Sequence, residues 1–201
     1  LNLSKLTWQL EAEKAGAGAL AAQGSHLIDL IRCLIGEFES VCALAQKTTD
    51  GGDVEQVMLL QAKLECGAVG TLEVSQVAAG SNIDLRVEVY GTRGSLRFDN
   101  SQPNVLRIYE LTDKELESGD GFREIQTMQR LPDAVFPPPR VDVNWLRYHL
   151  ASQHRFIKAL IEGTEPAPPT AFDGLKCQEV MEAACRSARE GRWVKLAEIC
   201  S

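Results

Sequence analysis

The feature that most constrains the fold is a run of strand-like segments between residues 40 and 126. In one of them, Ile83, Leu85 and Val87 alternate with the charged residues Asp84 and Arg86. This period of two is typical of a strand with one buried face. Short glycine-containing turns join successive segments, at residues 51–53, 66–67 and 92–94. Because short turns connect antiparallel neighbours, the run predicts a large, mostly antiparallel open sheet.

Helical patterns stand on both sides of this run. Apolar side chains recur with a period near 3.6 in residues 19–35, at Leu20, Leu27, Leu30, Ile31 and Leu34. Two further helices are predicted, over residues 143–162 and 172–190, and Asp173 is expected to cap the second. We also expect a short strand at 5–10, a loop at 131–141 and a last strand at 192–196. The whole pattern predicts an α+β fold with helices packed on one face of the sheet.

Composition excludes several classes of protein. The net charge is −7 and the 21 Lys and Arg residues are scattered, which argues against a nucleic-acid partner. No segment approaches the roughly 20 apolar residues of a membrane span, so no membrane partner is expected. Six cysteines without a C-x-x-C pair indicate buried, reduced thiols in a cytoplasmic protein. The three histidines do not provide the cluster of closely spaced ligands that a zinc site needs.

A glycine-rich segment precedes the first long helix. Residues 16–21 match the dinucleotide fingerprint G-x-G-x-x-A through Gly16, Gly18 and Ala21. That fingerprint binds a pyrophosphate only when a buried strand leads into the turn. Here the preceding residues, EAEKA, are charged and helix-like, and no acidic residue ends a second strand. We therefore assign no cofactor-binding residue to this segment.

His26, on the helix that follows, is the candidate for chemistry. Histidine is a common proton donor and acceptor near neutral pH. The alternative is a histidine that is hydrogen-bonded at the edge of a core. Asp29 lies one turn later and could orient the imidazole or be an exposed helix residue.

Five segments, in order, resemble the Gfo/Idh/MocA oxidoreductases, the group of glucose-fructose oxidoreductase and inositol dehydrogenase. Residues 16–36, GAGALAAQGSHLIDLIRCLIG, are similar to the family pattern G-G-G-x-L-x-D-x-G-x-H-x-x-D-x-x-x-x-L-x-G. The hairpin ECGAVGTLEVS and the strands VEVYGTRGSLRF resemble the next conserved pieces. The closing helices resemble the family in RFIKALIEG and in residues 173–196.

This resemblance implies that residues 1–201 are a single C-terminal domain for substrate binding and oligomerisation. The family's N-terminal Rossmann domain binds NAD or NADP, and we expect it to be absent from this chain. The 201 residues alone are then expected to bind no cofactor and to be inactive. The resemblance further implies a sugar-like or polyol-like substrate and a homo-oligomer that forms through the sheet face.

The site residues of the family match this chain only in part. His26 matches the family histidine that assists proton transfer beside the substrate hydroxyl. Asp29 matches the acidic residue one turn later, and Gly18 and Gln23 of the same segment are assigned as substrate-binding or supporting residues. The family's aspartate, four residues before the histidine, falls at Ala22, so this carboxylate is missing.

Two functions remain open from the sequence. The first is the C-terminal domain of an NAD(P)-dependent oxidoreductase that transfers a hydride from a sugar, polyol or related secondary alcohol. The second is a non-catalytic binding or scaffold module derived from such an enzyme. The alanine at Ala22 favours the second, and the match at His26 favours the first.

Overall fold

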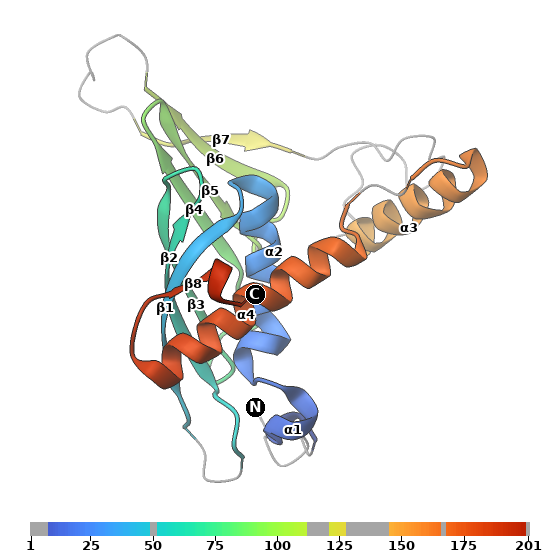
Figure 1. The fold of residues 1–201 in the computed structure, drawn as a ribbon. Coiled ribbons are helices and arrows are strands. Elements are labelled where there is room, and N and C mark those ends of the chain that lie inside the picture. The colour runs from blue at the N-terminus through green and yellow to red at the C-terminus, as the bar shows by residue number, and fades with distance from the viewer. Residues whose placement is uncertain (1–7, 49–51, 112–120, 128–144, 166–167, 200–201) are drawn as a thin grey trace. The chain divides into compact units, whose positions relative to one another are not determined.

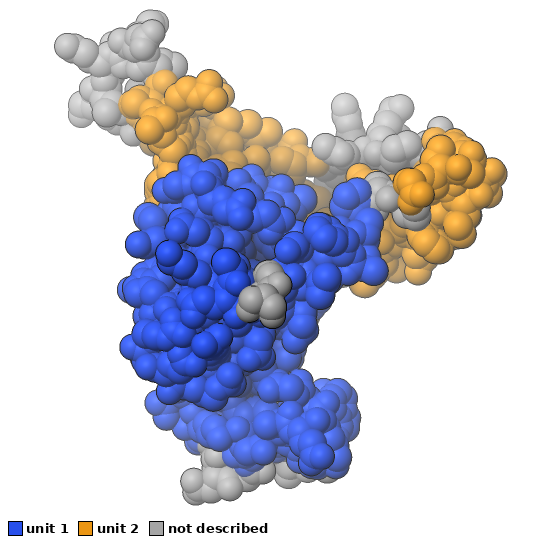
Figure 2. Space-filling model, viewed as in Figure 1, with its two compact units in different colours: residues 1–79, 168–201 blue, residues 80–167 orange. Residues whose placement is uncertain are grey.

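The computed structural model describes residues 8–48, 52–111, 121–127, 145–165 and 168–199. The chain divides into two compact units, one of residues 1–79 with 168–201 and one of residues 80–167 (Figure 2). Each unit contains one four-stranded antiparallel sheet. The α+β class is confirmed, but the strands form two hydrogen-bonded sheets where the sequence analysis placed one. The separation falls at residues 76–85, which form no strand.

The first unit contains the sheet β3-β2-β1-β8, which we call the first sheet (Figure 1). Its strands are β1 (Phe38–Gln46), β2 (Val57–Leu64), β3 (Val69–Ser75) and β8 (Val194–Lys195). Its helices are α1 (Ala12–Ala15), α2 (Ser25–Leu34) and α4 (Ala171–Glu190), with a π-helical turn over Leu20–Gly24. The expected hairpin between β2 and β3 is confirmed, with Gly67 at φ 87° in its turn.

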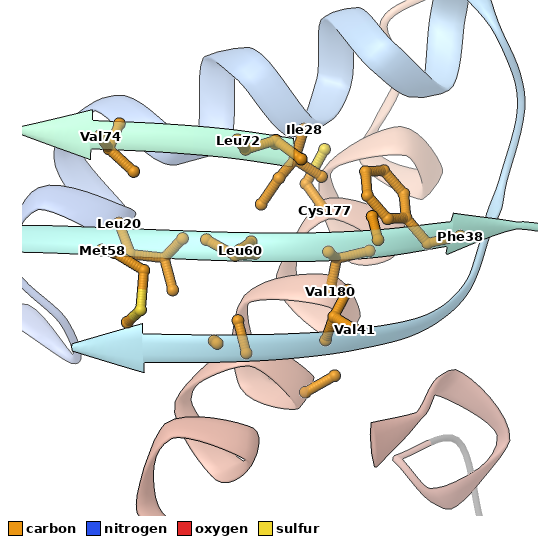
Figure 3. Packing of buried hydrophobic residues seen from close by; sticks show 14 of the residues in the cluster. Leu20, Ile28, Phe38, Val41, Met58, Leu60, Leu72, Val74, Cys177 and Val180 are labelled. Atoms are coloured by element: carbon orange, nitrogen blue, oxygen red, sulfur yellow. The ribbon is translucent and has the colours of Figure 1, made fainter. Parts of the chain in front are cut away.

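One face of the first sheet forms the main core. Along β2, Met58, Leu60, Ala62 and Leu64 are buried, and the residues between them are exposed. Figure 3 shows side chains of these strands meeting side chains of the helical segments. Helix α4 packs on β1 and α2 packs on α4, so both helices cover the same face. The expectation of helices on one face is therefore confirmed for this sheet.

The helix predicted over residues 19–35 is present. The predicted stripe is confirmed at Leu20, which is buried, and at Leu27 and Ile31, which are half-buried against the core, but the end of the stripe is displaced. Ile28 is fully buried, whereas Leu34, which the sequence pattern placed on the apolar stripe, is 57% exposed. The π-helical turn at Leu20–Gly24 explains the difference, because it adds a residue to one turn. Every later position is then shifted by about one residue relative to a constant 3.6-residue period.

A buried guanidinium joins α2 to α4. The side chain of Arg32 is 5% exposed and donates two hydrogen bonds to Glu37, at 2.8 and 2.7 Å. It also donates to the backbone oxygen of Asp173 at 3.0 Å. The Asp173 carboxylate accepts hydrogen bonds from the backbone and side chain of Thr170, at 2.7 and 2.8 Å. This capping box at the start of α4 confirms the cap expected at Asp173.

The second unit contains the sheet β4-β5-β6-β7, which we call the second sheet. Its elements are β4 (Arg86–Gly91), β5 (Gly94–Asp99), β6 (Val105–Glu110), β7 (Arg123–Gln126) and α3 (Trp145–Glu162). The alternation predicted for β4 is confirmed from Arg86 onward, where charged residues are exposed and valines are half-buried. Ile83 is an exception, because it lies before the strand and is exposed. Cross-strand ion pairs such as Arg107–Glu124 and Arg123–Glu110 lie on this sheet.

Several local expectations are corrected by the structure. Trp8–Leu10 form a 3-10 turn where a strand was expected, because the Glu11 N–H bonds back to the Trp8 oxygen. The rest of that segment and the loop expected at 131–141 lie outside the described residues. The five described cysteines are free, but Cys33 and Cys66 are exposed rather than buried. Cys33 lies beyond the π-helical turn, on the exposed side of α2.

None of the helices in the described part of the chain combines the length and the apolar character needed to cross a bilayer.

Ile28→Ala is expected to lower the free energy of unfolding by about 2–5 kcal/mol, because it opens a cavity in the core. Leu34→Ala, on the same helix, is the matched control and should change it by less than about 0.5 kcal/mol. Urea unfolding of both variants measures the difference. Equal effects of the two substitutions would contradict the displaced stripe.

Glu37→Gln is expected to reduce the loss of stability in acid. The hydrogen bonds from Arg32 hold the pKa of the Glu37 carboxyl below its ordinary value of 4.5. The unfolded chain therefore takes up this proton first as the pH falls. The stabilisation is complete above about pH 4.5 and is lost as the pH falls through the lower folded-state pKa.

Urea unfolding followed from about pH 7 to about pH 3 measures this dependence. Arg32→Met completes a double-mutant cycle with Glu37→Gln, because it removes the hydrogen-bond donor of the Arg32–Glu37 pair. We expect the two substitutions to be coupled. Strictly additive effects across the acid range would show that the pair does not stabilise the fold.

Candidate functional site

The glycine-rich segment binds a carboxylate of its own chain. The backbone N–H of Gly18 donates to both carboxylate oxygens of Glu55 at 3.0 Å, and that of Leu20 donates to Oε1 at 2.9 Å. The N–H of Ala19 donates to the backbone oxygen of Glu55 at 3.0 Å. The N–H groups that resemble a phosphate-binding turn thus have an internal anion as their acceptor.

Gly18 is required by this close approach. A Cβ atom at this position would lie 1.9 Å from the backbone oxygen of Glu55, which no side chain tolerates. The sequence analysis assigned Gly18 to the substrate-binding or supporting residues. In the structure it is buried and supports the start of the helical segment.

The segment then continues through the π-helical turn into α2. The N–H of Ser25 bonds to the oxygen of Leu20, five residues earlier, and the Ser25 Oγ donates to the oxygen of Ala21 at 3.0 Å. Gly24 is buried on the core side, where a Cβ would lie 2.8 Å from the Leu20 side chain. The opposite side of the same turns faces outward. Insertions of this kind occur frequently at functional sites.

The outward side carries the candidate residues of the sequence analysis. Ala22 and Gln23, in the π-helical turn, and His26, in the first turn of α2, are all exposed. The structure therefore brings Gln23 and His26 to one surface. Ala22 lies on the same surface, so an aspartate at this position would also be exposed. We call the surface formed by Ala22, Gln23 and His26 the α2 face.

Asp29 is directed to other partners. Its carboxylate lies 3.7 Å from Arg32 Nη1, and the Cys177 thiol donates to it at 3.8 Å. Burial raises the pKa of that Cys177 thiol. Between the described side chains of His26 and Asp29 the structure records no hydrogen bond. Asp29 accordingly supports the contact between α2 and α4.

The sequence analysis did not identify Glu55 as part of this arrangement. Glu55 lies just before β2 and is separated from Gly18 by 37 residues. An acidic residue before a strand has no periodicity that distinguishes it from a surface residue. Only the burial of its carboxylate, which is an unusual state for glutamate, reveals the role.

A metal centre has no candidate ligands in the part of the chain that the structure describes, because no three His, Cys, Asp or Glu side chains cluster there. The chemistry that this site can offer is that of an exposed imidazole and an exposed carboxamide. Both can donate or accept hydrogen bonds with a hydroxylated ligand.

Comparison with known proteins identifies the family. Residues 2–196 match the model described as the oxidoreductase family, C-terminal alpha/beta domain. Levoglucosan dehydrogenase of Pseudarthrobacter phenanthrenivorans is 28% identical over 221 residues, which cover 98% of this chain and 56% of that protein. Inositol 2-dehydrogenase of Rhizobium meliloti is 28% identical over 193 residues, covering 92% of this chain and 51% of the relative.

Solved structures agree with the sequence comparison. Levoglucosan dehydrogenase in complex with NADH and levoglucosan matches with a TM-score of 0.85 at 28% identity, covering 95% of this chain and 53% of that one. The chain spans about half the length of the curated relatives it matches. The family match extends over almost the whole chain and the fold agrees with it. The chain therefore belongs to the Gfo/Idh/MocA oxidoreductase family and corresponds to its C-terminal alpha/beta domain.

Proposed function

We propose that this chain is the substrate-binding and oligomerisation domain of an NAD(P)-dependent dehydrogenase. Its substrate would be a sugar, a polyol or a related secondary alcohol. The observation that carries the proposal is the α2 face, where His26 and Gln23 are exposed on a segment anchored to the core. The identity to levoglucosan and inositol dehydrogenases supports this class of substrate.

In this proposal His26 accepts a proton from the substrate. When bound to the full-length protein, the nicotinamide coenzyme would accept the hydride from the C–H bond of the secondary alcohol. His26 would take the proton of the O–H bond, so that the alcohol would leave as a ketone. Gln23 would hold a neighbouring hydroxyl through its carboxamide. A histidine is suited to this step because it exchanges protons near neutral pH.

The coenzyme would be bound by another part of the protein. Levoglucosan dehydrogenase was solved with NADH, which supports a nicotinamide coenzyme here. In this chain the N–H groups of the glycine-rich segment are occupied by Glu55. We propose that residues 1–201 form one domain that is inactive alone. We also propose that the protein has no nucleic-acid partner, supported by the net charge of −7, and no membrane partner, supported by the lack of a long apolar segment. A cytoplasmic location is proposed from the six cysteines, which contain no C-x-x-C pair.

A second function is supported by Ala22. This residue is exposed on the α2 face, beside Gln23 and one turn before His26, and it offers no carboxylate to polarise or bind a hydroxyl. A module that binds a ligand or a partner without turnover would retain the fold and lose this group. The first proposal remains preferred because His26 itself is exposed and accessible.

His26→Ala is expected to lower kcat by about 10²- to 10⁴-fold, the usual contribution of a general acid or base. The assay uses the full-length protein with NAD and NADP and a panel of sugars and polyols. His149→Ala is the matched control, because His149 is an exposed histidine on α3. Turnover that is unaffected by His26→Ala would overturn the proton role, and absence of turnover in the unaltered protein would favour the scaffold.

We propose that the homo-oligomer expected from the sequence forms through one face of the first sheet. Side chains on the side of the first sheet opposite the helices form what we call the outer face. Leu44 and Leu59 lie opposite each other there and are exposed, Leu44 by 70%. Val69 is 77% exposed and lies opposite Lys63, whose ammonium group stacks 5.1 Å from the Trp193 ring. Apolar side chains on an exposed sheet face are typical of subunit contacts.

Leu44→Arg is expected to convert the full-length protein from an oligomer to a smaller species. A charged side chain at the centre of a buried subunit contact would be desolvated without a partner. Light scattering at micromolar concentration measures the mass. Leu175→Arg, an exposed leucine on α4 in the same unit, is the control and should leave the mass unchanged. A monomeric unaltered protein would contradict the proposed contact.

A further inference from the structure

The strongest unexplained feature is the buried carboxylate of Glu55. The residue is 7% exposed, and its carboxylate accepts hydrogen bonds from the N–H groups of Gly18 and Leu20. Its backbone oxygen accepts a further bond from Ala19. The mechanism proposed above does not use Glu55, which lies before β2 and does not belong to the α2 face.

Glu55 stabilises one conformation of the segment before His26. The first N–H groups of a helical segment have no partners within it, and they carry partial positive charge. A carboxylate withdrawn from water is stable only when donors replace its hydration. In the observed arrangement of residues 18–20, the N–H groups gain an acceptor and the Glu55 carboxylate gains its donors. The Gly18 backbone is in direct contact with the backbone of Glu55, so a small displacement would break several bonds together.

The segment that Glu55 binds, residues 18–20, is connected to His26 by the π-helical turn. Leu20 begins the π-helical turn and also donates to the Glu55 carboxylate. Gly24 ends the turn, where an added Cβ would lie 2.8 Å from the Leu20 side chain and 3.5 Å from that of Val74 on β3. The turn that precedes His26 thus contacts Glu55, just before β2, at its beginning and lies close to Val74 of β3 at its end.

We propose that Glu55 is a positioning residue for His26 and Gln23. It acts through the backbone of residues 18–24 and sets the direction in which the α2 face presents these side chains. This inference rests on the proposed function for its effect on turnover. The anchoring of the segment itself can be measured without any activity.

The first experiment is a double-mutant cycle in the full-length protein, with kcat measured per folded site. Glu55→Ala should lower kcat by about 10- to 100-fold, since a displacement near 1 Å in a reacting group has effects of this size. Added to His26→Ala, the same substitution should lower kcat much less, because it acts through His26. Glu65→Ala is the matched control, as Glu65 is an exposed glutamate at the other end of β2.

Rescue distinguishes positioning from general destabilisation. Glu55→Gln retains a carbonyl oxygen where Oε1 accepts from Gly18 and Leu20, so its kcat should lie within a few-fold of the unaltered protein. If Glu55→Ala fails to fold, Glu55→Asp takes its place in the cycle, because it keeps the charge but withdraws the carboxylate by one methylene group. Effects of Glu55 and His26 that multiply would overturn the proposal.

The second experiment needs no turnover and therefore separates this inference from the proposed function. Amide hydrogen exchange, followed by mass spectrometry, should accelerate at least 10-fold in peptides covering residues 18–26 of Glu55→Ala. Exchange in β2 and β3 should change little. Gly18→Ala should give the same pattern, and Gly70→Ala should not, because a Cβ at Gly70 meets nothing within 4 Å. Unchanged exchange at 18–26 would overturn the proposal even if the protein is an active dehydrogenase.

Discussion

The burial of one face of the first sheet is the interaction on which the rest of this structure depends. Strands β1, β2 and β3 present alternate side chains to that face, and α2 and α4 cover it. Burial of apolar surface of this kind is the main favourable contribution to folding. It also determines which side of α2 remains outside, so the exposure of His26 follows from the packing of Ile28.

Polar groups complete this core at three places where helices or strands end. Glu55 accepts hydrogen bonds at the start of the helical segment, and Arg32 binds acceptors near the start of α4. Ser187 is fully buried, where its hydroxyl accepts from the N–H of Ala43 and donates to the oxygen of Arg192. Glu55 accepts from N–H groups that the start of a helical segment leaves without partners, whereas Arg32 donates to a backbone oxygen inside the first turn of α4. These contacts specify positions that apolar packing alone does not distinguish.

The sequence patterns predicted most elements because their signals are local. The hairpin turn at Gly67, the alternation in β4 and the cap at Asp173 each involve residues close in sequence. The predictions that were wrong share a different cause. The turn at Trp8–Leu10 and the phase of α2 depend on hydrogen bonds that a constant period does not represent. The division into two sheets likewise depends on whether the consecutive strands β3 and β4 pair with each other, which alternation within a strand does not report.

The sequence alone determined the class of the fold, its family and the candidate His26, because alternation, helical period and motif order are properties of neighbouring residues. Tertiary structure alone decided what surrounds that histidine. It directed Asp29 to Cys177, 148 residues away, and it joined Gly18 to Glu55 across 37 residues. The physical reason is that these are hydrogen bonds between segments far apart in the chain. Their partners are selected only when the helices pack on the sheet.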